Sequence, residues 1–289
     1  MTVLIVGAGG QLGRCLCDLL ISRSIEFSSY NSKELDVTNL KSVEDVISLE
    51  RPAVVVNAAA YTAVDKAEEQ KEQAFSVNAT GAENLARACE GVGAALVHVS
   101  TDYVFDGKSE RPYTEIDTVN PINVYGSSKL LGEQLIAQRM ERYIVVRTSW
   151  VFSEYGSNFF KTMSRLALER DQVSVVDDQY GCPTYAGDLA LALLKFSELS
   201  VDENFDGWGV YHYCGAEQTS WFEFAKSIFE LHASKSSKSV ATLLPLPSKN
   251  YPTPAERPQY SVMSTQKATE LGIKAADWKA AIKKMISVS

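Results

Sequence analysis

Cysteine is scarce in this sequence and shows no pairing pattern. Five cysteines occur among 289 residues, an odd number, and they are scattered. The close pair Cys15-x-Cys17 has no partner pair that would complete a zinc knuckle. We therefore expect reduced, mostly buried cysteines and no bound metal.

Long apolar runs and an excess of positive charge are also missing. No run approaches the ~20 residues that a membrane-spanning helix needs, and the chain enters an apolar strand without a charged leader segment. The formal net charge of -8 gives no general attraction to nucleic acid or anionic membranes. We expect a cytoplasmic protein with no nucleic-acid or membrane partner, which holds any anionic ligand through local cations and helix N-termini.

What is present is typical of a globular α/β protein. The sequence is 45% hydrophobic and 22% charged. Apolar strands alternate with helical patterns through the first half, which predicts a doubly wound parallel sheet with right-handed crossovers. The strands are predicted near residues 3–6, 26–30, 53–57, 94–100 and 143–147. After Trp150 the pattern loosens, with helices predicted at 158–169, 186–196 and 221–231 and strands at 173–176 and 209–213.

A glycine-rich turn follows the first predicted strand. The strand runs into Gly7-x-x-Gly10-x-x-Gly13, and a helical pattern begins at Leu12. Strand, glycine loop and helix in this order are typical of a turn that binds the pyrophosphate of a dinucleotide, because glycines let the backbone approach the phosphates at a helix N-terminus. A tight turn without a ligand is the alternative interpretation.

No acidic residue ends the second predicted strand. Residues 28–32 are Ser-Ser-Tyr-Asn-Ser, and Lys33 follows. A site for NADH places a carboxylate at this position to accept a hydrogen bond from the adenosine ribose. Its absence favours NADPH, with NADH as the other possibility. Lys33 could equally be a solvated loop charge.

Small and hydroxyl-bearing residues follow the third and fourth strands. Residues 58–60 are all alanine, which leaves room for a flat ligand beside the backbone or simply allows close packing. Ser100 and Thr101 end the fourth strand, where hydroxyls can donate to a carbonyl oxygen. His98 lies inside that strand, and we expect a hydrogen-bonded structural role for it.

Tyr125 and Lys129 are four residues apart and share one face of a predicted helix. A phenol ordinarily titrates near pH ~10, and an ammonium beside it lowers that pKa. The pair is therefore a candidate proton donor for the reduction of a carbonyl. A chance pair of surface side chains is the alternative.

Together these motifs resemble the extended short-chain dehydrogenases/reductases. More narrowly, the chain is similar nearly end to end to the branch that reduces the 4-keto sugar of dTDP-rhamnose synthesis. The stretches that carry this narrower resemblance are residues 10–13, 56–68, 100–105, 123–126, 147–151 and 251–255. The resemblance implies a Rossmann-type domain at 1–152 plus about 184–214, and a smaller substrate-binding lobe at about 153–183 plus 215–289.

The resemblance also implies a role for each matching residue. Tyr125 would be the general acid, Lys129 would hold the nicotinamide ribose and tune Tyr125, and Thr101 would hydrogen-bond the sugar near its carbonyl. The implied cofactor-binding residues are Gly7, Gly10, Gln11, Leu12, Asp36, Val37, Ala60, Tyr61, Thr62, Val99, Tyr125 and Lys129. The implied substrate-binding residues are Thr101, Asp102 and Trp150. To these we add Arg257, because a guanidinium fork suits the pyrophosphate of a nucleotide-sugar substrate.

Three alternatives share these features. The related dehydratases carry a Thr-Asp-Glu sequence, whereas Tyr103 follows Asp102 here, which disfavours dehydration. Nucleotide-sugar epimerases share the tyrosine–lysine pair. A regulatory subunit of methionine adenosyltransferase resembles the same reductases without being an enzyme. Some bacterial members form magnesium-bridged homodimers. Cys15 stands where we would align one of the bridging carboxylates, which disfavours that metal site and that dimer, although a homodimer of another kind is an open possibility.

Overall fold

The computed structural model describes residues 1–235 and 239–288, and a parallel sheet of six strands forms its centre. The strand order is β10-β5-β4-β3-β1-β2, so the chain moves outward from β1 in both directions. The strands are β1 (Val3–Val6), β2 (Phe27–Tyr30), β3 (Val54–Asn57), β4 (Ala95–Thr101), β5 (Tyr143–Thr148) and β10 (Gly209–His212). In such sheets a ligand crevice lies beyond the carboxyl ends of the strands where the order reverses, here β1 and β3.

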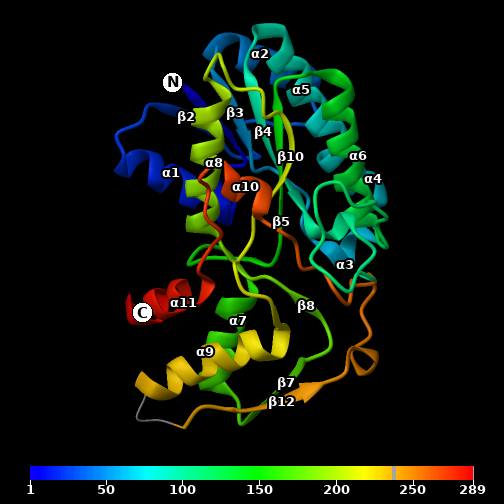
Figure 1. Cartoon of the computed structure of the whole chain (residues 1–289), viewed down its shortest axis with the longest axis vertical. Coiled ribbons are helices and arrows are strands. Elements are labelled where there is room, and N and C mark those ends of the chain that lie inside the picture. Colours follow the sequence, from blue (N-terminus) through cyan, green and yellow to red (C-terminus); the bar gives the residue numbers. More distant parts are fainter. Residues whose placement is uncertain (236–238, 289) are drawn as a thin grey trace.

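Helices cover both faces of this sheet (Figure 1). Because side chains alternate along a strand, Val3 and Ile5 pack against α1 (Gln11–Ser22) and α8 (Ala186–Ser200). Leu4 and Val6 face the other way, toward α2 (Leu40–Glu50), α5 (Gly81–Val92) and α6 (Val124–Arg139). This arrangement confirms the predicted doubly wound α/β sheet.

The N-termini of the helices differ in a way that matters for ligand binding. Side chains of Asn39, Asn123 and Asn158 cap α2, α6 and α7 (Phe159–Glu169) by accepting from backbone N–H groups. At α1 the cap position is Gly10, which offers no side-chain hydrogen bond. The N–H groups of the first turn of α1 thus remain available to an anion.

One predicted helix contains an irregular turn. The sequence predicts a helix over 74–90, and the structure has α4 (Lys71–Phe75), the π-helical turn η1 (Ser76–Thr80) and α5 in direct succession. Buried Asn78 lies in this turn and donates to Ser128 of α6 and to the backbone oxygen of Tyr61. A wider turn of this kind often occurs near functional sites.

Several segments from the second half of the chain form a smaller lobe below the sheet in Figure 1. Its core joins α7, α9 (Trp221–Lys235), α11 (Trp278–Val288) and the paired strands β7 (Gln172–Val176) and β12 (Thr242–Leu246). Ala268 and Ile273, within the predicted lobe range, pack instead in the core beside α1 and α8. The proposed domain boundaries remain a prediction.

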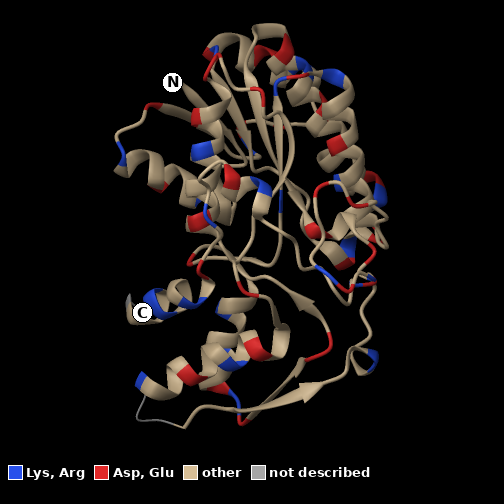
Figure 2. Ribbon diagram, in the orientation of Figure 1, with Lys and Arg blue, Asp and Glu red and all other residues tan. Residues whose placement is uncertain are grey.

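The remaining elements are short. They are α3 (Val64–Ala67), η2 (Asp102–Val104), β6 (Val151–Phe152), β8 (Tyr180–Gly181), β9 (Thr184–Tyr185), β11 (Thr219–Ser220), η3 (Ser248–Asn250) and α10 (Gln266–Glu270). All five cysteines are free and four are buried, as predicted. Within the described ranges no helix could cross a membrane. Charged residues lie mainly on outer helices and loops (Figure 2).

Candidate active site

Two adjoining cavities open beyond the carboxyl ends of β1 and β3. The first, the loop cavity, has a volume of ≈ 460 Å³, and the second, the tyrosine cavity, ≈ 330 Å³. Gly10, Ala58 and Ala60 line both, so the two cavities are direct neighbours. Predicted residues in the loop cavity are Gly7, Gly10, Asp36, Val37 and Ala60. Those in the tyrosine cavity are Gly10, Gln11, Leu12, Ala60, Thr62, Val99, Thr101, Asp102, Tyr125, Lys129 and Trp150.

The glycine loop is shaped to admit a phosphate group. Gly7 has a φ of +87°, and a Cβ there would lie 2.5 Å from the backbone nitrogen of Ala59. Gly10 is different, because the nearest atom to its Cβ would be 3.5 Å away. Glycine at position 10 thus leaves space beside the uncapped first turn of α1. The residues present fit the dinucleotide that the sequence predicts.

Helix α6 brings the predicted catalytic pair to the edge of β4. The Nζ atom of buried Lys129 donates to the backbone oxygen of Val99 at 2.7 Å and lies 3.1 Å from Nε2 of His98. Tyr125 lies one turn earlier, and its ring meets the ring of Tyr103 edge to face at 5.6 Å. The structure therefore places Thr101, Tyr125 and Lys129 in one cavity.

The pKa values of the pair differ from the simplest expectation. Burial raises the pKa of Tyr125 to about 12, and the Thr101 hydroxyl opposes this only in part. Burial lowers the pKa of Lys129 to about 8. The sequence predicts that an ammonium lowers the pKa of the phenol, and this prediction is wrong for the arrangement described, because desolvation dominates at both groups. Tyr125 thus keeps its proton at neutral pH.

Asp102 is a buried carboxyl beside the same cavity. Its side chain is 2% exposed and accepts from the Thr101 hydroxyl at 3.0 Å. Burial raises its pKa to about 6, while the hydroxyls of Ser261 and Thr101 act in the opposite direction. Folding therefore favours the protonated carboxyl of Asp102. The stability that this contributes is fully present at pH values below the pKa of Asp102 in the unfolded chain, and it is lost as the pH rises through 6.

Asp102→Asn should stabilise the protein at alkaline pH relative to the wild type. The amide stays neutral, whereas the wild-type carboxyl must ionise in a buried site. The free energy of unfolding of the variant, relative to that of the wild type, should rise by about 2 kcal/mol between pH 4 and pH 8. Urea unfolding at both pH values measures it. An unchanged difference would show that Asp102 titrates normally.

Trp150 and Arg257 lie near a third cavity, in the smaller lobe, whose lining is more apolar than those of the loop and tyrosine cavities. Trp150 has a φ of +47° and stacks on Trp221 with ring centroids 3.5 Å apart. Trp221 and Arg257 both line this cavity of ≈ 410 Å³. Arg257 donates to both carboxylate oxygens of Asp65, at 3.0 and 2.8 Å. Trp150 thus connects the tyrosine cavity to the cavity that holds Arg257.

Three residues around the site differ in how well the sequence predicts their roles. Tyr61 lies outside the lining of both the loop and tyrosine cavities, and its hydroxyl donates to Gln70 at 2.7 Å, so its predicted cofactor contact remains a prediction. Trp221 has no sequence signal, because only folding brings it against Trp150. His98 and Asn57 are hydrogen-bonded to each other, which agrees with the structural role expected for the histidine.

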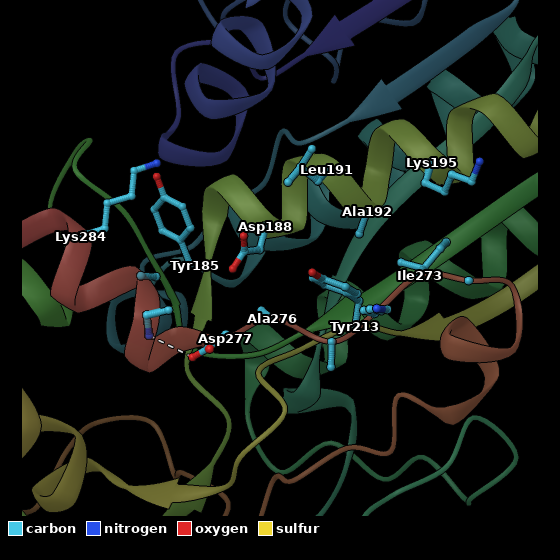
Figure 3. Close-up of a pocket in the computed structure, with 15 residues that line it drawn as sticks. Tyr185, Asp188, Leu191, Ala192, Lys195, Tyr213, Ile273, Ala276, Asp277 and Lys284 are labelled. Atoms are coloured by element: carbon cyan, nitrogen blue, oxygen red, sulfur yellow. Dashed lines mark hydrogen bonds between the residues drawn. The ribbon is translucent and has the colours of Figure 1, made fainter. Parts of the chain in front are cut away.

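A further cavity lies apart from these residues, between α8 and the segment leading into α11 (Figure 3). Its volume is ≈ 500 Å³, and Tyr185, Asp188 and Lys284 are among its lining residues. Burial raises the pKa of Asp188, Asp277 adds to the effect and Lys284 opposes it. No predicted site residue lines this cavity.

Comparison with known proteins places the chain in a family. The family model described as the RmlD substrate binding domain matches residues 1–289. The dTDP-4-dehydrorhamnose reductase of Aggregatibacter actinomycetemcomitans is 44% identical, with 97% of each chain covered. The protein of the same name from Escherichia coli is 38% identical over 99% of this chain and 97% of its own.

Solved structures agree with this placement. The crystal structure of dTDP-4-dehydrorhamnose reductase from Bacillus anthracis in complex with NADP superposes with a TM-score of 0.92 at 38% identity, over 100% of this chain and 99% of that one. The UDP-glucose 4-epimerase of Thermus thermophilus, with NAD, gives a TM-score of 0.81 at 20% identity over 98% of this chain and 97% of that one, a likeness of fold alone. The chain belongs to the dTDP-4-dehydrorhamnose reductase family.

Proposed function

We propose that the protein uses NADPH to reduce the C4 keto group of dTDP-4-dehydro-6-deoxy-L-mannose (dTDP-4-dehydrorhamnose), which yields dTDP-L-rhamnose, and that Tyr125 is the proton donor. The main support is that Thr101, Tyr125 and Lys129 line one cavity that adjoins the loop cavity at Gly10. The names of the similar proteins support the substrate, and the NADP complex of the Bacillus anthracis relative supports the cofactor.

The residues of this chain would divide the work as follows. The first turn of α1 at Gly10 would hold the pyrophosphate, and Lys129 would hold the nicotinamide ribose. Bound NADPH supplies a hydride to the carbonyl carbon. Tyr125 would give its proton to the carbonyl oxygen as negative charge develops there, and the Thr101 hydroxyl would rotate from Asp102 to donate to the same oxygen. Hydride and proton together account for the alcohol.

The nucleotide part of the substrate would extend toward the smaller lobe. The apolar cavity at Trp221 suits a nucleobase, and Arg257 beside it suits the pyrophosphate. Both Nη atoms donate to Asp65, which fixes the guanidinium in place, so a pyrophosphate would be bound through the N–H groups that do not face Asp65. A cytoplasmic location and a homodimer remain predictions from the sequence.

Lys33→Ala should weaken NADPH more than NADH. Lys33 lines the loop cavity with Asn31 and Ser32, where an adenosine 2′-phosphate would lie. Losing one charge-assisted contact should raise the KM for NADPH about 10-fold and leave that for NADH nearly unchanged. Lys41→Ala, which removes an exposed lysine paired with Asp45, is the matched control. Equal losses with both cofactors would reject a phosphate-binding role for Lys33.

The proposal is tested by the absorbance of reduced nicotinamide. Purified protein mixed anaerobically with NADPH and dTDP-4-dehydrorhamnose should oxidise one NADPH for each substrate. An epimerase would convert the sugar without net oxidation, and a regulatory subunit would bind cofactor without turnover. Either of those results, with a folded protein that binds NADPH, would overturn the proposal.

A further inference from the structure

Thr148, the last residue of β5, has a buried hydroxyl with no acceptor or donor beside it in the described part of the chain. The residue is 5% exposed, and its Oγ1 atom makes no hydrogen bond within the described residues. Burying a hydroxyl without a partner is unfavourable, so buried polar groups are nearly always paired. Thr148 also lines the tyrosine cavity. Its hydroxyl is therefore a candidate contact for a ligand.

The adjoining hydroxyls differ from that of Thr148 because each has an acceptor in the protein. Thr101 donates to Asp102 at 3.0 Å, and Ser149 donates to the backbone oxygen of Cys182 at 2.7 Å. The described residues include one other buried atom without a partner in the lining of this cavity, Oδ2 of Asp102. The sequence already assigns Asp102 to the sugar, whereas Thr148 has no assigned role.

Thr148 lies on the face of the sheet that α1 covers. Side chains alternate along a strand. Arg147 pairs with Glu133 of α6, whereas Val146 packs in the core that includes α1, so Thr148 shares the side of Val146. In the register of β4 and β5 Thr148 stands opposite Thr101. Thr148 thus belongs to the α1 side of the cavity, opposite the helix that carries the catalytic pair.

The segment that follows Thr148 is tied to the first turn of α1. Nε2 of Gln11 donates to the backbone oxygen of Val151 at 3.2 Å. Oε1 of Gln11 accepts from Ser153 and from Asn158, each at 3.2 Å. The fold therefore sets the position of Thr148 relative to the turn at which the pyrophosphate of a dinucleotide would bind.

The order of the strands indicates which part of the dinucleotide would reach Thr148. The loop cavity at the end of β2 suits the adenosine, and the turn between β1 and α1 suits the pyrophosphate. Lys129, the residue implied to hold the nicotinamide ribose, donates to Val99 of β4. The next strand in the sheet is β5. Beyond the ribose, the polar group of the nicotinamide is its carboxamide, which has two N–H donors and one acceptor oxygen.

We propose that the Thr148 hydroxyl binds the carboxamide of the nicotinamide and thereby fixes the orientation of the ring. Oγ1 itself is buried, but a strand residue has more than one common χ1 rotamer, and rotation about χ1 exchanges the hydroxyl with the methyl group. A hydroxyl can donate to the amide oxygen or accept from the amide nitrogen. The inference rests on the proposed use of NADPH and assigns no contact with the sugar.

Thr148→Val tests this contact, because valine replaces the hydroxyl with a methyl group of nearly the same size. The Kd for NADPH, measured by titration calorimetry, should rise about 10-fold, as expected for one lost hydrogen bond. The Kd for 2′-phospho-ADP-ribose, which has every part of NADPH except the nicotinamide, should change less than about 2-fold. Thr148→Ser keeps the hydroxyl and should bind NADPH within about 3-fold of the wild type.

The same variant should be more stable than the wild type when no ligand is bound. Because Oγ1 has no partner among the described residues, a methyl group there removes an unfavourable burial. The midpoint of thermal unfolding should rise by about 2 °C without NADPH. With excess NADPH the order should reverse, because the wild type binds the cofactor more tightly. A residue that serves only packing would shift both midpoints in the same direction.

Ser197→Ala is the control for removing a buried hydroxyl. Ser197 lies on α8 and donates to the backbone oxygen of Leu193 at 2.8 Å, so its hydroxyl is already paired. This variant should be less stable than the wild type with and without NADPH. Its affinity for NADPH and for 2′-phospho-ADP-ribose should be unchanged.

Three results would reject the proposal. They are an unchanged Kd for NADPH in Thr148→Val, an equal loss with 2′-phospho-ADP-ribose, and a ligand-free Thr148→Val protein that is less stable than the wild type. If the valine variant does not fold, Thr148→Ala gives the same comparison of the two ligands. A wild-type protein that does not bind NADPH would overturn the proposed function as well. Because no readout uses turnover of the sugar, the two failures are distinguishable.

Discussion

Tyr125→Phe should lower kcat at least about 100-fold while the affinity for NADPH stays nearly unchanged. Tyr125 is a titratable hydroxyl that lines the tyrosine cavity with Thr101, and its pKa of about 12 keeps it protonated before the reaction. Phenylalanine preserves the ring and its packing but supplies no proton. Single-turnover oxidation of NADPH measures the chemical step, and quenching of protein fluorescence measures cofactor binding.

Tyr103→Phe is the matched control for this experiment. Its ring packs edge to face on Tyr125 and it lines the same cavity. Burial and Asp102 raise its pKa as well, so both phenols keep their protons at neutral pH. The two differ in position, because Tyr103 lies in η2 and not on α6 with Lys129. The control should keep kcat within about 10-fold of the wild type. A Tyr125→Phe protein that retains turnover, or a control that loses as much, would exclude Tyr125 as the specific donor.

Glu133→Ala should lower the free energy of unfolding by about 3–5 kcal/mol. Glu133 and Arg147 form an ion pair in which both side chains are only 5% exposed. Arg147 donates to the carboxylate through Nε at 3.0 Å and Nη2 at 2.7 Å, and Ser100 donates to it as well. Removing the carboxylate leaves a buried guanidinium without its counter-charge. Arg147 Nη1 already has no hydrogen-bond partner within the described chain.

Urea unfolding at pH 7 measures this loss. Glu169→Ala is the control, because it breaks the exposed pair with Arg165 and should change stability little. Equal small changes in both variants would show that the buried pair is not a structural requirement. Because Glu133 lies on α6 one turn after Lys129, the loss should also disturb the catalytic pair, and cofactor binding of the folded fraction reports that effect.

The fold could be predicted largely because its strands are buried on both faces. Runs such as Val3–Val6 are apolar at every position, which is typical of parallel strands covered by helices. Helix α2 was predictable from Thr38 or Asn39 as its cap and from Arg51-Pro52 at its end. The structure has Asn39 as the cap. The π-helical turn at residues 76–80 carries no comparable signal, since it depends on contacts between Asn78 and α6.

The candidate site was predictable only where its residues are close in sequence. The spacing of Tyr125 and Lys129 places them on one face of α6, and strand ends place Thr101 beside them. The pKa values of Tyr125 and Lys129 could not be predicted, because burial in the folded protein is the largest cause of both shifts. The stack of Trp150 on Trp221 and the pair of Arg257 with Asp65 join distant segments, so neither follows from a local pattern.

The most direct test of the proposed reduction is the transfer of deuterium from cofactor to sugar. Protein incubated with dTDP-4-dehydrorhamnose and NADPH deuterated at the reactive C4 position should give dTDP-L-rhamnose with one deuterium, at C4 of the sugar, by mass spectrometry and proton NMR. We predict that result with stoichiometric loss of NADPH. A product without deuterium, or with deuterium at another carbon, would contradict hydride delivery to the C4 keto group.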